Sequence, residues 1–313
     1  MKPAAGSCPL CGHESTSAYK NGKFRFPKDI GAGRLCRCNS CGLVFQNPIP
    51  DDLSGFYEAY RGEEGKRFLN EVETIVKFFR RRRAVAINGL FARPGRVLDI
   101  GCGRGQMLQE LRSMGWECFG TEFPGQAAKG LPFRVYDSDL VDLHLPGESF
   151  DAITLWHVFE HLKDPFSALA EIGRILKPGG LLVISVPNID SLQAMIFGEN
   201  WLHLDLPRHI YHFSPPSLSR ALEKKGFIIE DWRHFSAEYG MSGTILSLGA
   251  VMTGKGPDFF NALRRGKRIW TYGIFVYSIL MAPFAAAFST LEALLKKGGE
   301  VIVLARKSGG SLG

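Results

Sequence analysis

Residues 96–111 read RVLDIGCGRGQMLQEL, and this stretch decides the fold class. The apolar run at 97–100 is typical of a buried parallel strand. Apolar residues recur at helical spacing over 107–111, which predicts the inner face of a following helix. The glycines between them, Gly101 and Gly103 among them, allow a tight turn that brings backbone against a ligand. A strand, a glycine turn and a helix in this order are typical of nucleotide-binding α/β folds.

Acidic residues and further apolar runs extend this pattern. Asp99 precedes the glycine turn, and a second acid, Glu122, ends the next predicted strand. An acid about 20 residues after the turn is placed to bind ribose hydroxyls. Apolar runs within 149–165 and 176–188 predict a fourth and a fifth strand. The dinucleotide-binding pattern expects a third glycine where this chain has Gln106, which counts against that alternative.

With these motifs the chain resembles the class I S-adenosylmethionine-dependent methyltransferases. LDIGCGRG (98–105) matches their first motif, LKPGGLLVIS (176–185) their fifth-strand signature, and EVIVLARK (300–307) looks like their last strand. The resemblance covers roughly residues 90–235 together with that last strand. It implies an α/β, Rossmann-like, doubly wound fold with a seven-stranded, mostly parallel sheet, and S-adenosyl-L-methionine as the cofactor.

The resemblance also assigns cofactor contacts. Asp99 and the glycine turn line the methionine and ribose side, and Glu122 takes the ribose hydroxyls. YDSDL (136–140) matches the loop that contacts adenine, and Trp156 follows the fourth strand near the methyl group. The expected cofactor-binding residues are Asp99, Gly101, Gly103, Glu122, Asp139, Leu140 and Trp156.

Five of the seven cysteines lie within the first 41 residues. Two CxxC pairs, Cys8 with Cys11 and Cys38 with Cys41, supply the four thiolates that zinc prefers in a closed structural site. A module of about 45 residues has too little core to fold alone, so the metal would supply its folding energy. Cys36 is a spare candidate. This N-terminal segment resembles the zinc-ribbon arm of methyltransferases clustered with cell-surface polysaccharide and sugar biosynthesis.

Candidate catalytic residues come from two places. Methyl transfer from a sulfonium depends on alignment and exclusion of water, and a general base helps when the acceptor is a hydroxyl or an activated carbon. His157 follows the fourth strand and is the preferred base, the alternative being a histidine that caps the strand end. Arg208 and His209 lie in an insertion rich in aromatic and histidine residues. Arg208 can clamp a phosphate or carboxylate, or can pair with Asp205 and only staple the insertion.

The expected activity is methylation of a small-molecule or lipid-linked acceptor in cell-envelope glycan biosynthesis. One alternative is a ribosomal-RNA base methyltransferase with a zinc finger, but the fourth strand lacks the Asn-Pro-Pro-Tyr motif. The ribbon also lacks interleaved basic and aromatic residues, so nucleic acid is not an expected partner. A non-catalytic cofactor-binding scaffold is the other alternative, and the intact glycine turn with Glu122 counts against it. The acceptor atom, oxygen, carbon or nitrogen, stays open.

Residues 269–291 form a run of 23 positions without charge. A helix of this length can cross a bilayer core of about 30 Å. The strand at 300–307 must nevertheless pair with strands made earlier, which excludes a single crossing. A second crossing by 239–254 would export several cations against the positive-inside tendency. The start of the chain lacks an apolar signal segment. We therefore expect a cytoplasmic protein, peripheral or monotopic, that contacts the inner leaflet through 239–291, the alternative being a buried cap or dimer surface.

These observations divide the chain into five regions. The regions are a zinc ribbon at 1–50, a helical lead-in at 51–92, a methyltransferase core at 93–236 with a lid insertion at about 189–213, an apolar helical insertion at 237–299, and a last strand with a Gly/Ser tail at 300–313.

Overall fold

The computed structural model describes residues 7–19, 34–49, 73–125, 127–254 and 268–309 of the chain. The chain divides into two compact units. We call the first the sheet unit; it comprises Glu71–Ser185, Ser219–Trp232 and Ile302–Gly313. We call the second the ribbon unit; it comprises Met1–Asn70, Val186–Leu218 and Arg233–Val301.

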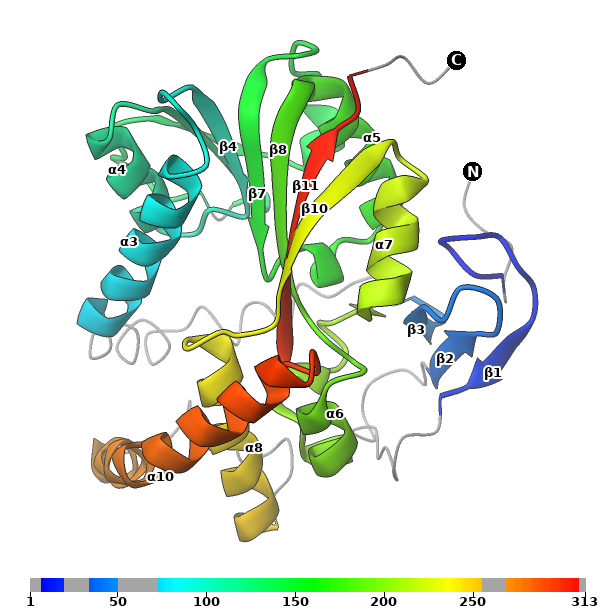
Figure 1. Ribbon diagram of the computed structural model, residues 1–313, viewed down its shortest axis with the longest axis vertical. Coiled ribbons are helices and arrows are strands. Elements are labelled where there is room, and N and C mark those ends of the chain that lie inside the picture. The colour runs from blue at the N-terminus through cyan, green and yellow to red at the C-terminus, as the bar shows by residue number, and fades with distance from the viewer. Residues whose placement is uncertain (1–6, 20–33, 50–72, 126, 255–267, 310–313) are drawn as a thin grey trace. The chain divides into compact units, whose positions relative to one another are not determined.

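A seven-stranded, mostly parallel sheet forms the centre of the sheet unit (Figure 1). Its order is β10-β11-β8-β7-β4-β5-β6, and the four pairs from β8 to β6 are parallel. The strands are β4 (Arg96–Ile100), β5 (Glu117–Glu122), β6 (Arg134–Asp137), β7 (Phe150–Trp156), β8 (Leu176–Pro187), β10 (Phe227–Arg233) and β11 (Glu300–Lys307). The α/β, doubly wound, seven-stranded fold expected from the sequence is confirmed.

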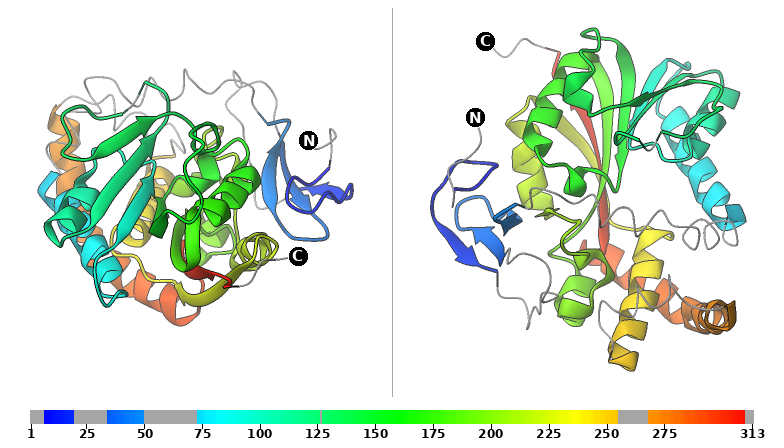
Figure 2. Two further views of the ribbon diagram at one scale, coloured as in Figure 1. Left: turned by 90° about the horizontal axis from the view of Figure 1, so that it is seen from above. Right: turned by 180° about the vertical axis from the view of Figure 1, so that it is seen from behind.

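Helices cover both faces of this sheet (Figures 1 and 2). On one face lie α3 (Glu73–Asn88) and α4 (Gln106–Ser113), whose apolar sides join Val97, Ala152 and Val183 of the strands in one buried core. On the other lies α5 (Pro165–Ile175), which Asp164 caps by accepting the amide of Ser167 at 2.9 Å. A further helix, α7 (Pro215–Glu223), leads into β10. The predicted lead-in helix is α3; its expected start at 68–72 lies outside the described residues.

The strand order reverses between β4 and β7. From β4 the chain adds β5 and β6 on one side, and it then returns to place β7 and β8 on the other. Ligands of open α/β sheets bind outside the carboxyl ends of the strands at such a switch point. The residues that follow β4, β5 and β7 therefore form the candidate site.

The ribbon unit contains a four-stranded antiparallel sheet. It is built from β1 (Thr16–Ala18), β2 (Arg34–Cys38), β3 (Val44–Asn47) and β9 (Tyr211–His212). The pairing of β3 with β9 joins the cysteine-rich N-terminal segment to the insertion that follows β8. Buried Gln46 strengthens this junction, because its Nε2 donates to the carbonyls of Pro207 at 2.9 Å and His209 at 2.8 Å. Leu35, Val44 and Trp201 belong to one apolar core, so the N-terminal segment packs as part of a larger unit.

Three helices complete the ribbon unit. They are α6 (Leu192–Phe197), α8 (Tyr239–Thr253) and α10 (Arg268–Leu294), with short 3-10 turns at Gly198–Asn200 and Leu202–Leu204. Figure 2 shows α8 and α10 crossing, and the hydroxyl of Tyr277 donates to the carbonyl of Ile245 at 3.0 Å. The carboxylate of buried Glu292 accepts from the amide of Gln193 at 3.1 Å and from its Nε2 at 2.7 Å, which ties α6 to α10.

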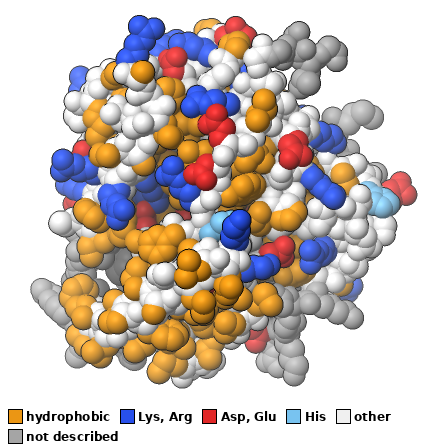
Figure 3. All heavy atoms as spheres, viewed as in Figure 1, with side chains coloured by type: hydrophobic (Ala, Val, Ile, Leu, Met, Phe, Trp, Pro, Cys, Tyr) orange, Lys and Arg blue, Asp and Glu red, His pale blue; other side chains and the backbone are white. Residues whose placement is uncertain are grey.

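Much of α10 is uncovered. Phe275–Leu294 is long and apolar enough to cross a membrane by length and composition, and 17% of its most apolar window is buried. Figure 3 shows apolar side chains gathered over α8 and α10. The exposed large apolar residues of this helix are Phe275, Val276, Ile279, Leu280, Phe284, Leu291 and Leu294. A soluble core helix of this length is mostly buried, so this exposure calls for a partner.

Candidate functional site

The glycine turn after β4 adopts a backbone shape that side chains resist. Gly101 and Gly103 have φ of 70° and 56°, in the left-handed region that favours glycine. A Cβ on Gly101 would lie 2.4 Å from Cγ2 of Val158, whereas a Cβ on Gly103 would meet no atom within 4 Å. The first glycine is thus required by packing, and the second leaves open space beside the backbone. That open space suits a ligand lying against the turn.

Glu122 faces this turn from the end of β5. The parallel pairing of β4 with β5 brings the two together, and the amide of Gly103 donates to Oε2 of Glu122 at 2.7 Å. The other carboxylate oxygen accepts from the amide of Phe123 at 3.2 Å. A carboxylate held at the rim of a glycine turn fits an acid that binds ribose hydroxyls. The residues present therefore fit the nucleoside part of the expected cofactor.

Asp99 lies buried at the end of β4. The hydroxyl of Thr154, on β7, donates to its Oδ1 at 2.6 Å. Burial raises the pKa of Asp99 to about 7, against the opposing effects of the Thr154 bond and of the positive charges of Arg80 and Arg83. Both arginines lie on α3, so this helix brings positive charge to the glycine turn. Sequence reasoning did not assign α3 any part in the site.

His157 follows β7 in a strained conformation. Its φ is 54°, unusual for a residue with a side chain, and its amide donates to the carbonyl of Ser185 at 3.0 Å. Its Nδ1 lies 3.3 Å from Oε1 of buried Glu160, in the short 3-10 helix η2 (Phe159–His161). Burial alone would raise the pKa of Glu160, but hydrogen bonding to His157 and the charges of His157 and His161 hold it below its ordinary value. The sequence gave no role to Glu160, which here orients the imidazole.

The remaining expected cofactor residues belong to the same unit. Asp139 directly precedes the 3-10 helix η1 (Leu140–Asp142), in which Leu140 is buried. This turn follows β6, which pairs with β5 so that Asp137 stands beside Glu122. Trp156 ends β7, and the guanidinium carbon of Arg83 lies 4.2 Å from its ring centroid.

Arg208 and His209 belong to the ribbon unit, whereas His157 belongs to the sheet unit. Both are buried. Arg208 forms an ion pair with Asp205, its Nε donating to Oδ1 at 3.3 Å, which is the pairing that the stapling interpretation expects. The Nδ1 of His209 lies 2.7 Å from the carbonyl oxygen of His203. These bonds place Arg208 and His209 in one polar cluster with Asp205.

The four cysteines predicted as metal ligands lie together. The sulfurs of Cys8, Cys11, Cys38 and Cys41 all lie within 4.8 Å of one another. The Cys8–Cys41 and Cys11–Cys38 sulfurs are 3.4 and 3.6 Å apart. Zinc–sulfur bonds of about 2.3 Å in a tetrahedron put sulfurs about 3.8 Å apart, so the set fits a zinc ion. Gly12 and Gly42 follow the two pairs with φ of 76° and 75°, as tight turns around a metal require.

Comparison with known families gives one match over half of the chain. The family model described as a methyltransferase domain matches residues 73–231. The match begins with α3 and includes every strand of the sheet except the last.

Curated relatives include a ubiquinone biosynthesis O-methyltransferase from Cereibacter sphaeroides, 30% identical over 146 residues (42% of this chain, 59% of the relative). A demethylmenaquinone methyltransferase from Deinococcus radiodurans is 36% identical over 140 residues (41% and 58%). The chain thus spans less than two thirds of the length of either relative.

Similar solved structures include the [4+2]-cyclase SpnF, with 25% identity, coverage of 74% of this chain and 81% of that chain, and a TM-score of 0.48. Another is phosphoethanolamine N-methyltransferase 2 of Haemonchus contortus in complex with S-adenosyl-L-methionine, with 19% identity, coverage of 72% and 52%, and a TM-score of 0.49.

Proposed function

Because the chain belongs to the methyltransferase-domain family, we propose that it transfers a methyl group from S-adenosylmethionine to a small-molecule acceptor. The observation that carries this proposal is the contact between Gly103 and Glu122. A glycine turn that is open at Gly103 and rimmed by the Glu122 carboxylate supplies close backbone approach and ribose recognition in one place.

The cofactor would be held by residues of the sheet unit. Glu122 would accept the two ribose hydroxyls, and Asp139 and Leu140 would border the adenine. Asp99 would face the positively charged methionine end, where a carboxylate favours the ammonium group. Trp156 would close the site beside the methyl group. When bound, the cofactor supplies an electrophilic methyl group on a sulfonium.

His157 is the proposed general base. Glu160 holds Nδ1, which leaves Nε2 to accept a proton from the acceptor. A carboxylate beside the ring also stabilises the imidazolium that forms when the proton arrives. The buried, anionic Glu160 therefore both orients and supports the base. Arg208 and His209 are proposed to contact the acceptor, with a weaker case because Asp205 engages the Arg208 guanidinium.

We assign the acceptor to cell-envelope glycan biosynthesis, as a small or lipid-linked molecule. The support is the resemblance of the cysteine-rich segment and of the insertion at 200–218 to arms found on methyltransferases of that setting. The curated relatives named for ubiquinone and menaquinone biosynthesis are compatible with an apolar acceptor.

A structural zinc ion is the second cofactor that we propose. The four clustered sulfurs leave no coordination position for a reactant, so the ion would fold the ribbon rather than take part in chemistry. Cys36 lies on β2 outside this set.

We further propose that α10 and the neighbouring ends of α6 and α8 contact the cytoplasmic leaflet of a membrane. Exposed Met195 on α6 and Met252 on α8 extend the apolar surface of α10. The hydroxyl of Thr290, exposed on α10, donates to the carbonyl of Ala286 at 2.8 Å, which satisfies it without water. Basic residues at 264–268 and 296–297 flank the helix, and each is worth about 1 kcal/mol near anionic headgroups.

The activity is tested with purified protein, labelled S-adenosylmethionine, and soluble and lipid fractions of a cell lysate. The expected result is release of S-adenosylhomocysteine together with a labelled product in one fraction. A protein that binds the cofactor but labels nothing in either fraction would support the scaffold alternative.

A further inference from the structure

The four consecutive arginines of α3, Arg80 to Arg83, do not lie alike. Arg81 and Arg82 are exposed; Arg81 lies 3.9 Å from Glu110, and Arg82 lies over exposed Phe78. Arg80 and Arg83 are half-buried on the side of the helix that carries buried Ala84 and Ile87. Positions spaced by three and four residues share one face of a helix. Two of the four charges therefore point toward the body of the sheet unit.

Arg83 meets the site at Trp156. Its guanidinium carbon lies 4.2 Å from the centre of the indole ring, a stacked arrangement that leaves the edge N–H groups available to a planar oxyanion. The indole Nε1 of Trp156 is buried and has no hydrogen-bond partner among the described residues. A buried N–H without a partner is costly, so it indicates a place where a ligand acceptor belongs. Positive charge and an unsatisfied donor thus meet on one ring.

The charges around the glycine turn suit an anionic acceptor. Arg80 and Arg83 both act on the Asp99 carboxyl, so both guanidinium groups lie close to the cofactor side. Asp99 and Glu122 offset these two charges. S-adenosylmethionine then adds a sulfonium and an ammonium against one carboxylate, which leaves the site with net positive charge. An acceptor with its own anion would restore the balance.

The position of Trp156 favours the acceptor over the cofactor as the source of that anion. Trp156 directly precedes His157, the proposed base, at the end of β7. A general base must reach the atom from which it takes the proton, so the acceptor binds next to His157. A guanidinium stacked on the neighbouring ring is therefore on the acceptor side.

We propose that Arg80 and Arg83, with the indole N–H of Trp156, bind a carboxylate or phosphate group of the methyl acceptor. This inference rests on the proposed function and narrows its substrate class to anionic small molecules or anionic lipid-linked ones. The arginines position the acceptor and take no part in the proton transfer.

The test uses the full-length protein saturated with S-adenosylhomocysteine, into which inorganic phosphate or benzoate is titrated in a calorimeter. Arg80→Gln and Arg83→Gln are compared with Arg81→Gln and Arg82→Gln, which remove the same charge from the outer side of α3. The expected result is binding of one or both anions by wild type. Arg80→Gln and Arg83→Gln should weaken it at least tenfold, while the two outer variants keep wild-type affinity.

A second titration distinguishes the sources of the anion. Arg83→Gln should bind S-adenosylhomocysteine within about twofold of wild type. A tenfold loss for that ligand, with unchanged affinity for methylthioadenosine, which lacks the carboxylate, would assign the arginines to the cofactor and overturn the inference. Anion binding that is absent, or equally weak in all four variants, would also overturn it. Wild type that fails to bind S-adenosylhomocysteine at all would instead contradict the proposed function on which the inference rests.

Discussion

The Nδ1 atom of His157 lies 3.3 Å from Oε1 of Glu160, and the carboxylate is buried. This pairing decides which ring nitrogen faces the acceptor, because Nδ1 is committed to Glu160. Neutral imidazole carries one donor and one acceptor, so a donating Nδ1 leaves Nε2 as the base.

Glu160→Gln should therefore slow methyl transfer without weakening cofactor binding. Loss of an orienting partner typically costs about 10–100-fold. The acidic limb of the rate profile should also move to lower pH, because a neutral amide no longer favours the protonated ring. Steady-state rates against pH, with S-adenosylhomocysteine affinity as the control, provide the check. Unchanged rates would mean that the pair is only structural.

Zinc removal should unfold the N-terminal segment and leave the sheet unit folded. Metal analysis should give close to one zinc per chain, and Cys41→Ser should lose it because three thiolates hold zinc far less tightly than four. Cys36→Ser is the matched control, since Cys36 lies on the neighbouring strand outside the four-sulfur cluster, and it should keep the metal. Equal zinc content in both variants would contradict the assignment.

The strongest local signals in the sequence were sufficient for the fold. The strand predicted at 300–307 is β11 with the same bounds, and the glycine turn falls between β4 and α4. These elements are encoded by short apolar runs and glycines whose meaning does not depend on distant residues. The pairing of β3 with β9 could not be predicted, because it joins two strands far apart in the chain that carry no mutual signal.

Site residues that depend on orientation were also missed. Glu160 could be recognised only once the left-handed φ of His157 and the short helix η2 placed its carboxylate beside the ring. Arg80 and Arg83 belong to a run of arginines whose two inner members are visible only when α3 lies on the sheet. Helical spacing from Ala84 and Ile87 was the available signal, since those apolar positions mark the inner face.

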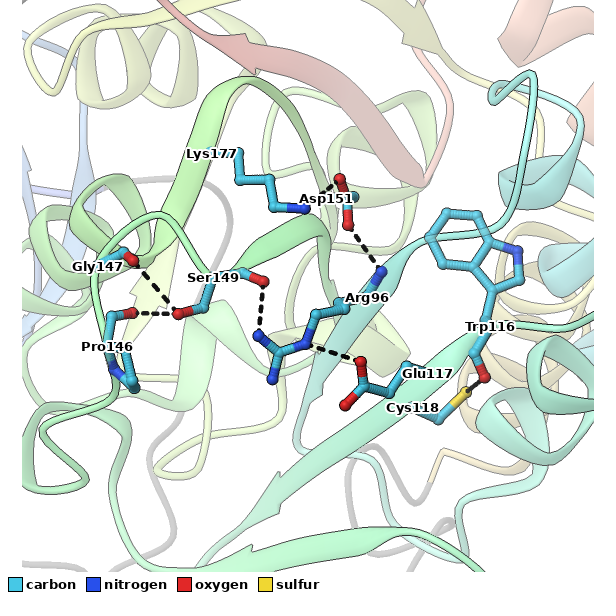
Figure 4. Close-up of polar contacts among 9 residues, drawn as sticks. All are labelled: Arg96, Trp116, Glu117, Cys118, Pro146, Gly147, Ser149, Asp151 and Lys177. Atoms are coloured by element: carbon cyan, nitrogen blue, oxygen red, sulfur yellow. Dashed lines mark hydrogen bonds and ion pairs between the residues drawn. The ribbon is translucent and has the colours of Figure 1, made fainter.

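Asp151 should stabilise the sheet unit at the end opposite the site. Figure 4 shows its carboxylate accepting the amide of Arg96 at 2.8 Å and the ammonium of Lys177 at 2.7 Å. Burial opposes them, but these bonds hold the pKa of Asp151 below its ordinary value of 3.8. Asp151→Asn should lower the free energy of unfolding by about 1–2 kcal/mol at pH 7, as is usual for bonds to charged groups.

A depressed carboxyl pKa stabilises the folded state above the unfolded pKa and loses that contribution as pH falls through the folded pKa. The gap between wild type and Asp151→Asn should thus be full at pH 5 to 7 and shrink below pH 4. Denaturant unfolding at several pH values measures it. Asp142→Asn, at an exposed position, should show no comparable gap.

The membrane proposal predicts a matched difference between two isoleucines. Ile279 on α10 and Ile228 on β10 are 56% and 62% exposed, so neither substitution should disturb a core. Ile279→Glu should reduce the membrane-bound fraction by about tenfold, because burying an isoleucine in lipid is worth about 1.5–3 kcal/mol. Ile228→Glu should leave it unchanged. Flotation with anionic vesicles gives the answer, and wild type that stays unbound would point to a covered dimer surface instead.

Cofactor binding by calorimetry tests the central claim most directly, because it requires no knowledge of the acceptor. Wild type should bind S-adenosylhomocysteine at one site per chain. Glu122→Ala removes the acceptor of the two ribose hydroxyls and should weaken that binding by about 2–4 kcal/mol, with the unfolding transition of the sheet unit retained. Affinity that is unchanged in Glu122→Ala, or wild type that does not bind the ligand, would contradict the account.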